Sequence, residues 1–172
     1  MEQKVVNPEN FDFNAFSEIG KNWTLISACD ESRTDKKIGT MTASWGGIGV
    51  LWNKNVFFCF VRPQRFTKEF IDASDTVSLS FFDEKYRSAL TFCGRNSGRD
   101  CDKINEAGLT AKITDGAVFF EEARLTIVGK KLFCQYMDKE SFCDKSLIPM
   151  HYPDGDFHMA YVCEITGMYV NE

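Results

Sequence analysis

Short runs of aromatic and β-branched residues recur along nearly the whole chain, and they constrain its fold more than any other feature. Each run is four to seven residues long, and runs of this kind favour β-strands. Polar or glycine-containing breaks such as Gly129-Lys130-Lys131 and Asp154-Gly155-Asp156 separate the runs. The expected strands are Trp23–Cys29, Val56–Val61, Val77–Phe82, Ala117–Phe120, Leu125–Val128, Leu132–Met137 and Met159–Ile165.

Short helices are expected between these strands. Asp12 can cap a helix that ends at Gly20, Thr67 can cap a second, and Asp83 can cap a third that runs to about Phe92. A fourth is expected from Asp100 to Ala107. Because strands and long helices do not alternate, a parallel doubly wound sheet is disfavoured. The pattern instead predicts a mainly β protein, a closed or partly closed antiparallel barrel with a few short helices.

The length and charge of the chain limit what it can be. With 172 residues and no linker or repeat, we expect a single domain over 1–172, with 1–10 as a flexible or peripheral N-terminal arm. A net charge of -5 opposes binding to nucleic acid or to an anionic membrane. No apolar stretch approaches the ~20 residues of a membrane-spanning helix, and no signal-peptide core is visible, so we expect a cytoplasmic protein.

Several common catalytic motifs are missing. The run Gly46-Gly47-Ile48-Gly49 suggests a dinucleotide-binding loop, but Trp52 stands where the third glycine belongs and no long helix follows. There is no phosphate-binding P-loop, no zinc-binding histidine pair and no nucleophile elbow. The seven cysteines are scattered without Cys-x-x-Cys spacing, which indicates reduced thiols and no metal site.

Three segments carry residues suited to ligand binding. Thr40–Gly46 interleaves small hydroxyl residues with Trp45, and could present donors to a flavin ring or a phosphate, or be an ordinary polar edge strand. Arg62–Thr67 places two guanidinium groups beside a helix start, as in a phosphate site or a solvated turn. Cys93–Lys103 combines glycines with three basic residues, and could hold an anion, form a dimer contact, or be a charged surface loop.

Taken together, these segments resemble the flavin reductase-like family, the FMN-binding split-barrel group that includes flavoredoxins. The resemblance extends from Trp23 to Ile165. It rests on Met41-Thr42-Ala43-Ser44-Trp45-Gly46, on Val61-Arg62-Pro63-x-Arg65-Phe66-Thr67, on Leu79-Ser80-Phe81-Phe82, on Cys93-Gly94-x-x-Ser97-Gly98-Arg99-Asp100-x-Asp102-Lys103, and on Gly155-Asp156-Phe157-His158.

The resemblance implies a homodimer of antiparallel, Greek-key split β-barrels, each binding FMN near the dimer interface. It places Thr42, Ala43, Ser44 and Trp45 beside the flavin ring, Arg62, Arg65 and Thr67 near the ribityl phosphate, and Phe81 and Phe82 close to the cofactor. Ser97 and Arg99 belong either to the phosphate site or to the interface. His158 could face the flavin or the nicotinamide, or be a half-buried histidine bonded to the backbone. Phe66 stands where tyrosine is frequent in similar sequences.

The activity that the resemblance implies is oxidation of NADH or NADPH by the flavin, which passes electrons to an acceptor. In such a protein the flavin carries the chemistry, so no catalytic side chain is required beyond a possible auxiliary role for His158. A flavoredoxin-like electron carrier or flavin-binding module, reduced by a protein partner, is the alternative. A split-barrel oxidase acting on an amine such as pyridoxamine phosphate is a third reading.

Overall fold

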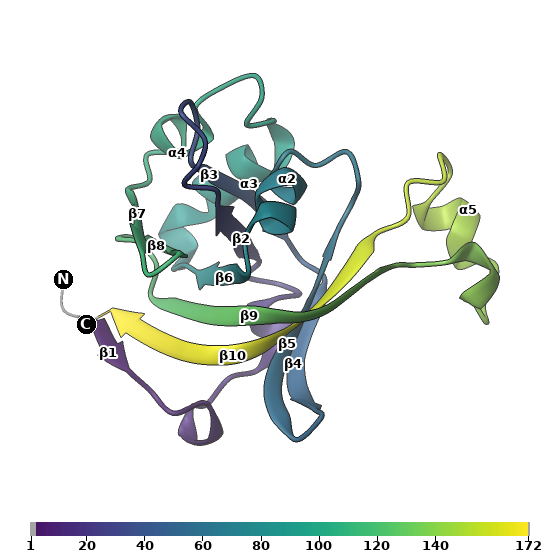
Figure 1. Ribbon diagram of the computed structural model, residues 1–172, viewed down its shortest axis with the longest axis horizontal. Coiled ribbons are helices and arrows are strands. Elements are labelled where there is room, and N and C mark those ends of the chain that lie inside the picture. Colours follow the sequence, from purple (N-terminus) through teal and green to yellow (C-terminus); the bar gives the residue numbers. More distant parts are fainter. Residues whose placement is uncertain (1–2, 172) are drawn as a thin grey trace.

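An antiparallel sheet of eight strands forms most of the computed structural model, which describes residues 3–171 (Figure 1). The strands follow the order β3-β2-β6-β9-β10-β5-β4, and β1 pairs with the far end of β10. A separate hairpin joins β7 and β8. The strands are β1 Gln3–Val5, β2 Thr24–Cys29, β3 Ile38–Ala43, β4 Gly46–Leu51, β5 Lys54–Val61, β6 Thr76–Phe81, β7 Ala111–Thr114, β8 Ala117–Phe120, β9 Leu125–Tyr136 and β10 Met159–Asn171.

Short helices connect these strands. They are η1 Pro8–Asn10, α1 Ala15–Glu18, α2 Thr67–Ala73, η2 Glu84–Tyr86, α3 Arg87–Arg95, α4 Lys103–Glu106, η3 Lys139–Ser141 and α5 Leu147–His151. The predicted caps are wrong in detail. Asn14, not Asp12, caps α1, and Asp102, not Asp100, caps α4. Neither Thr67 nor Asp83 caps by its side chain, since Thr67 is the first residue of α2 and Asp83 precedes a 3-10 turn.

The sheet wraps around one apolar core, which confirms the predicted antiparallel β fold. Residues of β2, β3, β5, β6, β9 and β10 meet there, and Phe70 and Ile71 of α2 are fully buried among them. A second core lies on the other side of β2, where Leu25 and Phe120 pack against α3. Every residue of β2 is therefore buried, because both faces of the strand are covered.

Strand β9 is longer than the sequence pattern predicts. The predicted break at Gly129-Lys130-Lys131 is wrong, because these residues continue the strand and pair with β6 and β10. A Cβ atom on Gly129 would lie 2.4 Å from Cε1 of the buried Phe57 ring. The glycine therefore serves close packing of an aromatic side chain, not a turn.

The outer half of β9 and the start of β10 project beyond the barrel and carry α5 at their tip (Figure 1). We call residues 132–158 the β9–β10 arm. At the opposite end of β10, β1 lies on an edge of the sheet. The predicted N-terminal arm also includes Met1 and Glu2, which lie outside the described residues. Between residues 3 and 171, no helix has the length and apolar character needed to cross a membrane.

Strands β3 and β4 stand at the two open edges of the main sheet path, and only Ser44 and Trp45 connect them. The sequence pattern misses both strands because glycine and hydroxyl residues replace the usual aromatic and β-branched ones. A tight turn at Trp52 and Asn53, with φ values of 53° and 56°, joins β4 to β5. Such left-handed pairs match the twist of a two-residue hairpin.

Candidate functional site

Two hollows adjoin the Ser44–Trp45 connection between the two sheet edges, and a third shares lining residues with both of them. The Trp45 hollow has a volume of ≈ 190 Å³ and is lined by Met41, Thr42, Ala43, Ser44, Trp45, Phe60, Arg62, Arg65 and His158. The Thr91 hollow, of ≈ 210 Å³, shares Thr42, Ala43 and Ser44 with it. The Lys103 hollow, of ≈ 110 Å³, shares Met41 and Arg65 with the Trp45 hollow and Arg95 with the Thr91 hollow.

Most of the predicted site residues line these hollows. They are Thr42, Ala43, Ser44, Trp45, Arg62, Arg65, Thr67 and Ser97, together with His158. The Thr42 hydroxyl already donates to the Leu90 carbonyl oxygen at 2.5 Å, so its proton is used inside the protein. Its predicted contact with the flavin ring would therefore use the oxygen as an acceptor, or the methyl group.

Phe81 and Phe82, which were predicted to lie close to the cofactor, line none of the three hollows. Phe81 is fully buried inside the barrel, where its ring packs edge-on against Phe13 at 5.2 Å. Phe82 follows on the opposite side and packs against Phe120 in the second core. The two side chains point to opposite faces because successive residues alternate along an extended chain.

The Lys103 hollow is lined by three cations and no carboxylate among the described residues. Arg65 donates to the Gly94 carbonyl at 3.1 Å, and the buried ammonium of Lys103 donates to the Thr40 carbonyl at 2.8 Å. The Arg95 side chain makes no hydrogen bond or ion pair within residues 3–171. Burial lowers the pKa of the Lys103 ammonium, and the charge of Arg65 acts in the same direction. An anion entering this hollow would relieve that unfavourable burial of charge.

Hydroxyl groups complete the Lys103 hollow. Thr67 is buried at the start of α2, and Ser97 follows the end of α3. The Thr67 hydroxyl has no hydrogen-bond partner in the part of the chain that the structure describes, while the Ser97 hydroxyl accepts a bond from the Arg99 backbone at 3.2 Å. Donors of both kinds, charged and neutral, therefore face one small space.

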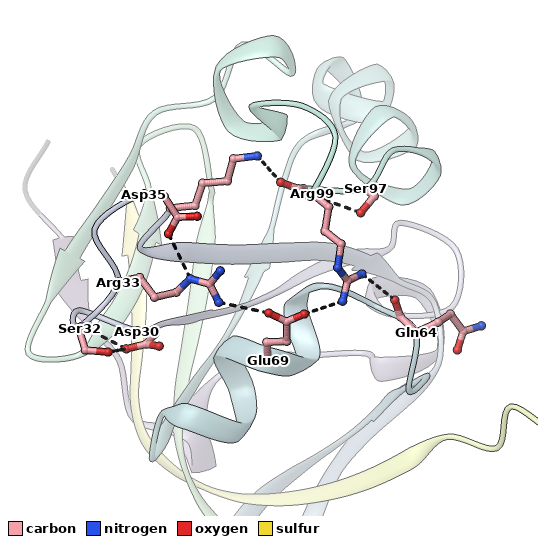
Figure 2. A network of polar contacts seen from close by, with 10 residues as sticks. Asp30, Ser32, Arg33, Asp35, Gln64, Glu69, Ser97 and Arg99 are labelled. Carbon is pink, nitrogen blue, oxygen red and sulfur yellow. Dashed lines mark hydrogen bonds and ion pairs between the residues drawn. The ribbon is translucent and has the colours of Figure 1, made fainter.

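Arg99, predicted for either the phosphate site or the dimer interface, lies outside the Lys103 hollow. Figure 2 shows its guanidinium between the Glu69 carboxylate, at 2.5 Å, and the Gln64 carbonyl, at 3.1 Å. Arg33 reaches the other oxygen of Glu69 at 3.2 Å. Both guanidinium groups also lie over the Phe66 ring, at 4.9 and 5.3 Å from its centroid. Arg99 thus holds the 97–101 loop against α2.

Two binding candidates were missed as site residues by the sequence prediction. Arg95 and Lys103 belong to the basic segment recognised in the sequence, but nothing in its spacing distinguished them from Arg99. Helix α3 ends at Arg95, so the Arg95 side chain lies beside Thr91 and Gly94 in the Thr91 hollow, whereas Arg99 lines none of the three hollows. Lys103 is buried against the Thr40 carbonyl of β3, a contact between residues far apart in the sequence.

At the Trp45 hollow, three rings from two segments lie together. The Trp45 ring centroid is 5.4 Å from that of His151 and 5.3 Å from that of His158. His158 is buried, and its Nδ1 lies 2.8 Å from the Tyr152 hydroxyl, so its bond is to a side chain and not to the backbone. Burial and the nearby positive charge of Arg62 lower the pKa of His158 to about 4. The imidazole is therefore neutral at pH 7.

Arg62 contacts the arm and not the Lys103 hollow. Its guanidinium pairs with the Asp156 carboxylate, donates to the His151 carbonyl at 2.8 Å, and lies 5.2 Å from the centre of the Tyr152 ring. The predicted pair of phosphate arginines is thus divided, with Arg65 facing the cationic hollow and Arg62 facing the arm.

Solved structures with the same fold come from flavin proteins. Flavoredoxin of Desulfovibrio vulgaris (Miyazaki F) aligns with a TM-score of 0.66 and 20% identity, covering 87% of this chain and 69% of that one. Flavoredoxin from Methanosarcina acetivorans gives 0.66 and 18%, covering 100% and 77%. A putative flavin reductase with a split barrel domain from Shewanella frigidimarina gives 0.67 and 18%, covering 88% and 68%. The predicted split-barrel fold is confirmed by these similarities.

Among curated proteins, no match was found. The family models give a clear result, since the model described as "Flavin reductase like domain" matches residues 16–172. This match spans the barrel strands β2 to β10 and every residue that lines the three hollows. The chain therefore belongs to the flavin reductase-like domain family.

Proposed function

We propose that this protein binds FMN at the three hollows and acts as an NAD(P)H-dependent flavin reductase. The observation that carries the proposal is the Lys103 hollow, where Arg65, Arg95 and Lys103 meet without a carboxylate in a chain of net charge -5. Phosphate oxygens accept several charge-assisted hydrogen bonds at once, so a phosphate monoester fits this donor set.

The adjoining hollows suit the flat ring of a flavin. Ala43 and Ser44 carry small side chains, and they lie between the Trp45 and Thr91 hollows. A Cβ atom on Gly94 would come within 3.3 Å of the Thr42 side chain, so the glycine keeps α3 close to this part of β3. Since β3 is an edge strand, its outer backbone groups have no strand partner and can serve ring oxygen and nitrogen atoms.

FMN, when bound, would supply the redox chemistry by accepting a hydride from the nicotinamide and releasing electrons to an acceptor. The protein's part is to bind the phosphate through Arg65, Arg95 and Lys103, to shape the ring pocket with Ala43 and Ser44, and to limit water at the ring with Trp45. His158 stays neutral near pH 7, so it adds no charge to this pocket.

The direct test is anaerobic mixing of the FMN-loaded protein with NADH or NADPH, followed by flavin absorbance. Rapid bleaching by either nucleotide is the expected result. FMN that stays oxidised with both nucleotides but is reduced by dithionite would favour the flavoredoxin-like electron carrier. Turnover of phosphorylated amines in place of nicotinamide oxidation would favour the oxidase reading.

We further propose that two copies of the chain associate through the β9–β10 arm and the neighbouring β4–β5 hairpin. Large apolar side chains are exposed there, including Phe133 at 45%, Tyr136 at 46%, Met150 at 67% and Trp52 at 55%. The rings of Trp52 and Phe133 lie 6.4 Å apart, so the hairpin and the arm contribute to one apolar surface. Exposed apolar patches of this kind mark interaction sites, and a second copy is the occupant we propose.

Phe133→Glu should convert this dimer to a monomer, because a carboxylate would be buried at the apolar contact. The measurement is light scattering coupled to size-exclusion chromatography. Val5→Glu is the matched control, since Val5 is also exposed but lies on β1 at the other end of β10. A wild-type monomer, or a dimer that survives Phe133→Glu, would contradict the proposed interface.

A further inference from the structure

Two arginines, Arg62 and Arg65, line the Trp45 hollow, and of these two Arg62 bonds to the arm. It follows β5, while the groups it binds belong to residues 151–156. One nitrogen, Nη1, donates to Oδ2 of Asp156, and the other, Nη2, donates to the His151 carbonyl at 2.8 Å. Its Cζ lies over the Tyr152 ring, 5.2 Å from the ring centroid. A guanidinium can make these three contacts together because its donors form a rigid fork.

The contacts continue from Arg62 to the wall of the hollow. Tyr152, under the guanidinium, bonds Nδ1 of His158 through its hydroxyl at 2.8 Å. His158 in turn contacts the Trp45 ring, as does His151. The positions of Trp45 and His158 therefore depend on where the 151–158 segment is held.

We propose that Arg62 is a positioning residue for the flavin ring: it fastens residues 151–158 to the end of β5, so that Trp45 and His158 form one wall of the ring pocket. The inference rests on the proposed function for its ligand and departs from the expectation that Arg62 binds the phosphate.

Asp156 is the residue through which the 151–158 segment bonds to both Arg62 and Gln64. Its Oδ2 accepts from both Arg62 and Gln64, the latter at 2.7 Å, and these bonds lower the pKa of the carboxyl. Its Oδ1 is buried and has no partner among the described residues. A carboxylate with one unsatisfied buried oxygen depends on the partners of the other, so loss of Arg62 should release the segment.

The charge around His158 provides a readout that needs no flavin. Arg62 and Arg65 act on the imidazole with positive charge, Asp156 acts with negative charge, and Tyr152 and His151 are the neighbouring titratable groups. Removing Arg62 takes away a positive neighbour and exposes the ring to water. Both changes favour the protonated form, so the pKa of His158 should rise from about 4 toward its ordinary value.

The experiment compares Arg62→Met with Arg65→Met. The chain has only two histidines, so their ring proton resonances can be followed by NMR in the flavin-free protein as the pH is changed. Arg62→Met should raise the pKa of His158 by about one unit or more. Arg65→Met should raise it less, because the charge of Arg65 acts on His158 more weakly than that of Arg62, and Arg65 bonds to the Gly94 carbonyl and to no arm residue among residues 3–171.

FMN titrations of the same variants separate positioning from phosphate binding. Arg65→Met should weaken FMN binding at least about tenfold, whereas Arg62→Met should change the dissociation constant less than about threefold. Flavin reduction by nicotinamide at saturating FMN should slow at least about tenfold in Arg62→Met only, because the wall of the ring pocket is displaced.

Two results would overturn the proposal: an unchanged His158 titration in Arg62→Met, or an FMN affinity reduced as far as in Arg65→Met. If Arg62→Met does not fold, Arg62→Gln takes its place, since glutamine keeps one donor group. Arg62→Gln should also raise the pKa of His158, and an unchanged pKa would contradict the proposal in the same way. Wild-type protein that fails to bind FMN would refute the proposed function instead, and the NMR titration would still decide whether Arg62 holds the arm.

Discussion

Lys103→Met should weaken FMN binding by about 1.5 to 3 kcal/mol, roughly 10- to 150-fold in Kd, while the thermal stability of the flavin-free protein changes much less. Binding weakens because a charged donor is lost from the Lys103 hollow. Stability changes less because two effects oppose each other: removal of the buried ammonium is favourable, whereas the Thr40 carbonyl loses its donor. Fluorescence quenching of FMN and calorimetry of the flavin-free protein measure the two effects.

The pH dependence of stability has a defined sign here. The folded-state pKa of Lys103 lies below its unfolded value, so the cost of burying the ammonium is fully present below the folded pKa. It disappears as the pH rises through that value toward the unfolded one. The free energy of unfolding of Lys103→Met relative to wild type should therefore be most favourable below the folded-state pKa of Lys103 and should fall as the pH rises above it.

Lys37→Met is the matched control, since Lys37 is an exposed lysine that lines none of the three hollows. It should leave FMN binding nearly unchanged. Equal losses in the two lysine variants would show that the effect is general electrostatics and not a phosphate contact.

Phe57→Ala should destabilise the protein by about 3–5 kcal/mol, a large part of the stability of an ordinary domain. Phe57 is fully buried on β5, and its ring lies against Gly129. Gly129 has no side chain that could move into the space, so the cavity should stay open. Urea unfolding of the two proteins gives the difference in the free energy of unfolding.

Phe58→Ala provides the control for this loss. Phe58 is the next residue on β5, is only partly buried, and faces Gly47 and Gly49 of β4. Its truncation should cost clearly less than that of Phe57. A similar loss in both variants would mean that the core does not close over Gly129 as described.

The sequence predicts the strands best where their residues are apolar or β-branched. The patterns at Val56–Val61 and Val77–Phe82 predict β5 and β6 almost to their ends. It fails at β3 and β4, where glycine and threonine form strands because the neighbouring strands supply the hydrogen bonds. It fails again at Gly129, since a glycine required by an aromatic neighbour looks the same in the sequence as one required by a turn.

The residues of the candidate site also differ in how well the sequence predicts their positions. Ala43, Ser44 and Arg65, which the family motifs contain, all line the Trp45 hollow. Arg62, Arg95 and Arg99 could not be separated by sequence, because each is an arginine in a polar loop or at a helix end. Arg62 pairs with Asp156 and Arg99 pairs with Glu69, and both partners are distant in the sequence. The Arg95 side chain has no partner among the described residues.

We expect the cationic Lys103 hollow to bind the phosphate of FMN, and riboflavin provides the comparison. Riboflavin has the same ring and ribityl chain but no phosphate. Titration of the wild-type protein should show FMN binding at least about 100-fold more tightly than riboflavin, and Lys103→Met should reduce that ratio. Equal affinity for FMN and riboflavin would contradict the account.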